Sequence, residues 1–128
     1  SLGPKTEVIA VCAEGATSML ESWRSNRVIE HERIDTIADG IGVRLPILEA
    51  VQDMQGLVDD ALTVSDTQML EAMHRALEGL GVLLEPSGAA GLAAAYASRK
   101  AGGDHSVRWQ CNQRAVPDMV CLIYQSWT

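Results

Sequence analysis

The sequence predicts an α/β domain with an open, mainly parallel sheet and flanking helices. Short apolar runs that suit buried strands alternate along the chain with segments of helical period. One helix has a complete start signal, because Ser65 and Gln68 form a capping box ahead of apolar residues at helical spacing. A later segment, residues 89–101, consists almost entirely of small residues, which allow a helix to pack closely on a sheet.

Three strands are expected from apolar content and bounding turn residues. Residues 7–13, EVIAVCA, are rich in Val and Ile and predict the first strand. Residues 57–64 predict the second, and residues 82–84 predict a short buried third. The strand order cannot be read from these runs, since no internal repeat supports one.

The helices are predicted from the spacing of their apolar residues and from residues that typically begin or end a helix. We expect a short helix over residues 17–24, a loop over residues 27–42, and a helix that starts at Pro46 and ends at Gly56. Ser87 is predicted as the N-cap of the small-residue helix, which Gly102 and Gly103 end. The helix after Ser65 should bury one apolar face, formed by Met69, Leu70, Met73, Leu77 and Leu80.

Composition excludes several classes of protein. The 128 residues are 47% hydrophobic and 21% charged, a balance that suits one globular domain. A net charge of -7 argues against a nucleic-acid partner, and no apolar run is long enough to span a bilayer. Three scattered cysteines suit neither a disulfide framework nor a metal site. We therefore expect a cytoplasmic protein with no membrane association.

Three acidic residues, Glu14, Asp39 and Glu85, lie just after or near apolar segments. Open α/β sheets place ligand-contacting residues beyond the carboxyl ends of their strands, so these acids are candidate site residues. Turn and capping roles are the commoner explanation for an acid beside Gly or Pro. Ser87 has the same ambiguity, because a helix start can be capped by it or can bind an anion there. The three histidines lack neighbouring ligands at zinc spacing.

Three separated motifs carry a resemblance to a known family: TIADGI, VDDALTVSD and EPSGAAGLAA, in this order. Residues 1–103 resemble the large domain of fold-type II pyridoxal-phosphate enzymes, the group of threonine dehydratase and serine racemase. The resemblance implies part of a three-layer domain. It also implies a chemistry in which pyridoxal phosphate acidifies the α-carbon of an amino acid and takes up the carbanion's electrons while a β-hydroxyl leaves.

The resemblance also assigns roles to residues. The loop at Asp39 and Gly40 and the acid at Glu85 border the cofactor and the substrate in such enzymes, so Asp39 and Glu85 are candidate catalytic residues and Gly40 and Ser87 candidate cofactor contacts. In some members an acid matching Glu14 and a carbonyl near Ser18 bind a divalent cation. Here residues 19–20, Met-Leu, stand where an acid pair is usual, with Glu21 displaced by one position.

The chain also departs from the family pattern. No SFKxRG-like segment with the cofactor-anchoring lysine is found among the 128 residues, which contain only Lys5 and Lys100, and no glycine-rich phosphate loop precedes Gly3. We therefore expect a fragment of a dehydratase that is inactive alone and does not bind pyridoxal phosphate by itself. The alternatives are a self-associating or partner-binding module, and half of a split enzyme complemented by an upstream fragment.

Residues 104–128 are predicted to be a divergent tail outside the family-like part. Residues 107–111 can be encoded by codons that read Cys-Gly-Gly-Asn one base later, a turn that the family has here, so we hypothesise a frameshift that the gene's nucleotide sequence would test. The tail should contribute little to the core, except that residues 119–124 could add an edge strand. Apolar surface left exposed by the missing segments predicts a homo-oligomer.

Overall fold

The structure is a computed structural model that describes residues 6–100, 106–109 and 120–125. Helices and strands alternate through most of the chain, and a long connection follows the first helix. In chain order the elements are β1 (Thr6–Ala13), α1 (Ser18–Ser25), the 3-10 turn η1 (Asp39–Ile41), α2 (Leu48–Met54), β2 (Asp60–Val64), α3 (Asp66–Leu80), α4 (Pro86–Lys100), β3 (Ser106–Trp109) and β4 (Val120–Gln125).

The sheet has the order β2-β1-β4-β3. The pair β1 and β2 is parallel, whereas β4 runs antiparallel to both β1 and β3. The predicted α/β class is therefore confirmed. The strands β1 and β2, which lie within residues 1–103, pair in parallel. The later strands β3 and β4 add antiparallel pairs, so the sheet is mixed.

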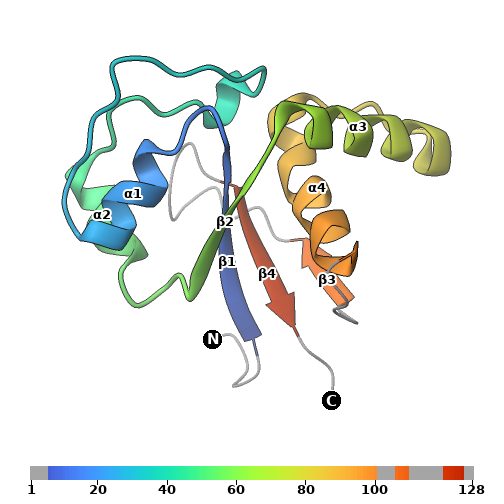
Figure 1. Cartoon of the computed structure of the whole chain (residues 1–128). Coiled ribbons are helices and arrows are strands. Elements are labelled where there is room, and N and C mark those ends of the chain that lie inside the picture. The colour runs from blue at the N-terminus through green and yellow to red at the C-terminus, as the bar shows by residue number, and fades with distance from the viewer. Residues whose placement is uncertain (1–5, 101–105, 110–119, 126–128) are drawn as a thin grey trace.

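Helices cover both faces of the sheet and give three layers (Figure 1). One face of β1 presents Val11 and Ala13 to a core that α3 and α4 cover. The other face presents Ala10 and Cys12 to a core shared with α1 and α2. Successive strand side chains point to opposite faces, which is why one apolar run supplies both cores.

Helix α3 begins as its sequence predicts. The Ser65 hydroxyl accepts a hydrogen bond from the Gln68 N–H at 3.1 Å, and the Gln68 side chain accepts one from the Ser65 N–H at 2.8 Å. These two bonds satisfy backbone donors that a helix start leaves without partners. The two predicted short helices are also present. Helix α1 lies one residue later than predicted, and α2 begins at Leu48 instead of Pro46 and ends at Met54.

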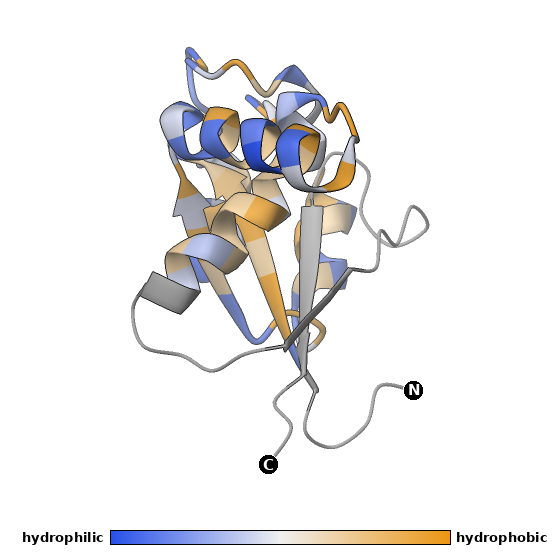
Figure 2. Ribbon diagram, turned by 90° about the vertical axis from the view of Figure 1, so that its right-hand side faces the viewer, coloured by the Kyte–Doolittle hydropathy of each residue, from blue (hydrophilic) through white to orange (hydrophobic). Residues whose placement is uncertain are grey.

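The apolar face predicted for α3 is wrong in part. Met69 is buried, but the buried positions beside it are Ala72 and Ala76. Hydrophilic and hydrophobic segments alternate along this helix (Figure 2). Helix α3 packs mainly on α4, and small residues at this contact bring the two helices close together. The remaining leucines of the predicted face are exposed by 49–76%: Leu70, Leu77 and Leu80.

The predicted buried strand at residues 82–84 is not formed. Gly81, with a φ of +65°, ends α3 in the left-handed conformation, and the N–H groups of Gly81 and Val82 bond back to carbonyls of the last turn. Val82 and Leu83 are 45% and 78% exposed. Helix α4 then begins at Pro86, so the few residues between the two helices make a surface link.

The prediction that Ser87 caps α4 is also wrong. Pro86 is the first residue of the helix, which places Ser87 second in its first turn. Proline favours this first helical position because its missing N–H has no intrahelical partner there. Ser87 therefore lies inside the helix, and its hydroxyl does not serve as a cap.

The tail contributes more to the sheet than its sequence predicts. Residues Val120 to Gln125 pair with β1 over six positions, from Val11 to Thr6, and β4 lies between β1 and β3. The predicted strand over residues 119–124 is thus an inner strand and not an edge. Within the described part of the chain, no helix is long and apolar enough to cross a membrane.

Candidate functional site

The carboxyl ends of β1 and β2 meet at one edge of the sheet. The N–H of Glu14, just after β1, donates to the carbonyl of Val64, the last residue of β2, at 2.9 Å. At this edge the long loop returns to the residues just after β1, where the Asp35 N–H donates to the Gly15 carbonyl at 2.9 Å. A Cβ atom on Gly15 would lie 1.6 Å from the Asp35 carbonyl oxygen, so only glycine permits this crossing.

The next residues of the loop are held by the first residue of α3. The Asp66 carboxylate accepts a hydrogen bond from the Thr36 hydroxyl at 2.7 Å and another from the Ile37 N–H at 3.2 Å. The Thr36 hydroxyl in turn accepts from the Ala38 N–H at 3.1 Å. An aspartate at a helix start is also favoured by the helix dipole. Asp66 therefore fixes the backbone immediately before Asp39.

Gly40 then lies directly against Ser87 in the first turn of α4. A Cβ on Gly40 would be 2.8 Å from the Ser87 hydroxyl oxygen and 3.2 Å from its Cβ. Two motifs that are almost fifty residues apart in the chain thus meet at the sheet edge. Ser87 is 6% exposed, and its hydroxyl has no hydrogen-bond partner among the residues that the structure describes. A buried hydroxyl without a partner is unfavourable, so Ser87 is a position where a ligand group or a water molecule can bond.

Four predicted site residues are brought together here. Asp39 and Gly40 form the start of η1, which contacts α4, and Glu85 immediately precedes that helix. Both carboxylates, Asp39 and Glu85, are exposed. The region therefore offers two solvent-facing acceptors, a buried hydroxyl, and a glycine that lets one backbone approach another.

The two predicted metal-site residues are placed differently. Glu14 is exposed at the end of β1, whereas Ser18 is fully buried at the start of α1. The Ser18 hydroxyl donates to the Val43 carbonyl, and the Ser18 carbonyl accepts from the Ser22 hydroxyl at 2.6 Å. Over residues 6–100 and the two short strands that follow, no group of three or more His, Cys, Asp or Glu could hold a metal ion.

The lysine whose backbone the structure describes, Lys100, lies far from the candidate site. Lys100 is the last residue of α4 and Ser87 the second, so their backbones lie about 20 Å apart along the helix axis. Lys5 is outside the described residues. Among the described residues, no lysine backbone therefore lies near Ser87.

Sequence reasoning missed Asp66 and Thr36. Asp66 directly follows the predicted cap Ser65, and Thr36 belongs to the TIADGI motif, so both were close to recognised signals. Their pairing spans 30 residues, and neither helical nor strand period reports such a contact.

An open α/β domain with polar residues at the carboxyl edge of its parallel strands has the architecture in which such proteins bind ligands. Comparison with known proteins is specific about the family. A family model described as pyridoxal-phosphate dependent enzyme matches residues 1–107. The chain belongs to this family, whose members use pyridoxal phosphate.

Individual proteins that are similar to the chain belong to the same family. The serine racemase of Arabidopsis thaliana is 38% identical over 96 residues, which are 73% of this chain and 28% of that protein. The biosynthetic L-threonine dehydratase of Lactococcus lactis is 34% identical over 91 residues, 71% of this chain and 22% of that protein. The crystal structure of the T.th. threonine deaminase matches with a TM-score of 0.68 and 28% identity over 72% of this chain and 34% of that one. The chain thus spans about a quarter of the length of the curated relatives.

Proposed function

We propose that this chain forms one side of the pyridoxal-phosphate site of a dehydratase or racemase that acts on serine- or threonine-like amino acids. The observation that carries the proposal is the contact between Gly40 and Ser87, because it joins the two family motifs at the ligand-binding edge of the sheet. The names of the relatives, serine racemase and L-threonine dehydratase, support the substrate class.

Each candidate residue has a chemical role in this proposal. The cofactor, when bound, acidifies the α-carbon of an amino acid and stabilises the resulting carbanion. Gly40 lets the backbone of η1 approach the cofactor side of the site, and the Ser87 hydroxyl supplies a hydrogen bond. The carboxylates of Asp39 and Glu85 face solvent and can accept hydrogen bonds or a proton from a hydroxy amino acid.

We propose further that the 128 residues are inactive on their own and need a lysine from elsewhere. The support is the position of Lys100, at the opposite end of α4 from the site, and the absence of an SFKxRG-like motif from these residues. A cytoplasmic location is part of the same proposal, since three scattered cysteines suit a reducing compartment.

Reconstitution tests this function. The chain is co-expressed with the lysine-bearing amino-terminal part of a serine racemase, and 2-oxo acid release from L-serine and L-threonine is measured. We expect activity only when both parts are present, with Glu85→Gln and Asp39→Asn lowering it by roughly 100-fold. Glu78→Gln, an exposed carboxylate on α3, serves as the matched control and should be fully active. Activity of the chain alone, or site variants as active as the control, would contradict the proposal.

The second candidate function is that of a self-associating module. One observation favours it: Leu77, Leu80 and Leu83 are 49–78% exposed at one end of α3 and in the link that follows. They lie at or next to an apolar groove of about 310 Å³ lined by Ala76, Leu80, Val82, Leu84, Gly88 and Leu92. Exposed apolar surface of this kind favours association, here with a second copy of the chain.

Light scattering separates this candidate from a monomeric protein. We expect the wild-type chain to be a dimer or larger, and the double variant Leu80→Gln, Leu83→Gln to be smaller at the same concentration. Arg75→Gln, on the same helix but outside the groove, is the control. A wild-type monomer at high concentration would contradict self-association.

A further inference from the structure

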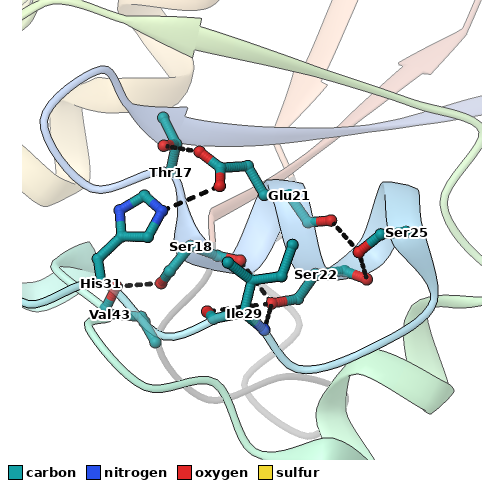
Figure 3. Close-up of polar contacts among 8 residues, drawn as sticks. All are labelled: Thr17, Ser18, Glu21, Ser22, Ser25, Ile29, His31 and Val43. Atoms are coloured by element: carbon teal, nitrogen blue, oxygen red, sulfur yellow. Dashed lines mark hydrogen bonds and ion pairs between the residues drawn. The ribbon is translucent and has the colours of Figure 1, made fainter.

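The loop between α1 and α2 is attached to α1 by a group of side-chain contacts (Figure 3). The Ser22 hydroxyl accepts a hydrogen bond from the Ile29 N–H at 2.8 Å, and the Ser18 hydroxyl donates to the Val43 carbonyl. Between these two points, the His31 ring donates from Nε2 to Oε2 of Glu21 at 2.9 Å. The contacts hold both arms of the loop, before and after the segment that carries Asp39 and Gly40.

Both carboxylate oxygens of Glu21 are engaged. Oε1 accepts from the Thr17 hydroxyl at 2.7 Å, and Oε2 accepts from His31. The hydrogen bond from Thr17, followed by the interaction with His31, lowers the pKa of Glu21 below its ordinary value. The neighbouring charges on the loop, Glu30 and Arg44, pair with each other at 2.5 Å. Glu21 therefore has one partner in the loop and one at the N-cap of α1.

A divalent cation does not fit this region. A hard cation needs six or more oxygen ligands, and the resemblance to the family offers Glu14, the Ser18 carbonyl and a second acid on α1. The Ser18 carbonyl already accepts from Ser22, and the buried apolar side chains of Met19 and Leu20 stand where that acid would be. The displaced acid, Glu21, is committed to Thr17 and His31.

We propose that the Glu21–His31 pair takes the place of a bound cation: it holds the loop of residues 27–44 on α1, and this part of the molecule is independent of divalent metal ions. The pair joins the side chain of a helical residue to a loop residue ten positions later, so it restricts the loop directly. The inference does not depend on the proposed catalytic function, because it concerns the free chain.

Hydrogen exchange of the full 128-residue chain tests the proposal. Exchange is measured for peptides from residues 27–44 and, in the same sample, from α3, first in chelator and then in excess Mg²⁺ or Ca²⁺. The variants are Glu21→Gln, His31→Ala and their double. Glu14→Gln removes the cation ligand that the resemblance suggests, and Glu32→Gln is a control on the same loop.

We expect neither cation to slow exchange in the loop. Glu21→Gln and His31→Ala should each speed loop exchange by about two- to fivefold relative to α3, the double variant no further, and Glu14→Gln and Glu32→Gln not at all. Slower loop exchange with a cation, abolished by Glu14→Gln, would overturn the proposal. So would unchanged loop exchange in the Glu21 and His31 variants, or a rise of equal size in α3.

Discussion

At the scale of single residues, two glycines decide how the loop meets the sheet edge. At Gly15 an added Cβ would strike a backbone carbonyl, whereas at Gly40 it would meet the side chain of Ser87. A backbone atom can move only with its whole segment, while a serine side chain can rotate. The two positions are therefore expected to respond differently to the same substitution.

We predict that Gly40→Ala lowers the free energy of unfolding by about 1–3 kcal/mol, the usual range for overpacking. Gly15→Ala should lower it by more, since the Asp35 carbonyl lies 1.6 Å from the added carbon. Urea unfolding followed by circular dichroism measures both. Gly56→Ala is not a suitable control because of its positive φ, but Gly79→Ala is, as open space surrounds Gly79 within its helix. Equal losses at Gly15 and Gly40 would be inconsistent with the contacts described.

We predict that Ser87→Ala leaves the stability of the isolated chain unchanged or raises it slightly. The hydroxyl is buried and has no partner within residues 6–100, and removal of such a group relieves a desolvation cost of about 1–3 kcal/mol. The same substitution should weaken a reconstituted site, where we propose that the hydroxyl contacts the cofactor. Urea midpoints of the isolated chain are the measurement, and a clear destabilisation would show that Ser87 has a structural partner.

Glu21 predicts a specific response to pH. The pKa of Glu21 is lower in the folded chain than in the unfolded one. Its contribution to folding stability is therefore fully present above the pKa of the unfolded state, and it is lost as the pH falls through the pKa of the folded state. The Glu21 side chain is 44% exposed, so its ion pair with His31 should stabilise the folded chain by less than about 1 kcal/mol. Unfolding free energies of wild type and Glu21→Gln should therefore converge as the pH falls below the pKa of an unperturbed glutamate, about 4.3. A difference that stays constant over this range would contradict the account.

At the scale of elements, the sequence predicts one helix start correctly, that of α3, but misplaces the cap of α4 and part of the buried face of α3. The Ser65–Gln68 capping box placed the start of α3 correctly because both partners are local in sequence. The buried face of α3 differs from the prediction because this helix packs on α4, a helix of small residues. Ala72 and Ala76 fit this close contact, whereas Leu70 and Leu77 remain exposed. Apolar content alone likewise suggested a strand at residues 82–84, where the left-handed Gly81 instead forms a turn. Periodicity does not report what an element packs against.

At the scale of the whole molecule, the tail supplies two strands of the four-stranded sheet. Its sequence lacked consistent caps and periods, and the antiparallel pairing of β4 with β1 depends on partners more than a hundred residues away. Such pairing cannot be inferred from local pattern. The sequence motifs indicate Asp39, Gly40, Glu85 and Ser87 as candidate residues, but the direct contact between Gly40 and Ser87 is a property of the fold.

Deletion of the tail tests its place in the fold. We predict that a chain ending at residue 103 loses cooperative thermal unfolding or aggregates, since β1 would expose the edge that β4 covers over six paired positions. Circular dichroism melting and light scattering of the shortened and full chains are compared at equal concentration. A shortened chain that melts cooperatively at the same temperature would show that β3 and β4 are dispensable.

As proposed above, these 128 residues form one side of a pyridoxal-phosphate site without a lysine to anchor the cofactor. The most direct measurement is the absorbance spectrum of the pure chain with pyridoxal phosphate, followed by borohydride reduction and mapping of modified lysines. The account predicts no stoichiometric adduct, and only weak labelling of Lys5 and Lys100 that Lys→Arg substitution at each position removes without changing the fold. One stoichiometric, borohydride-reducible adduct at a single lysine would contradict it.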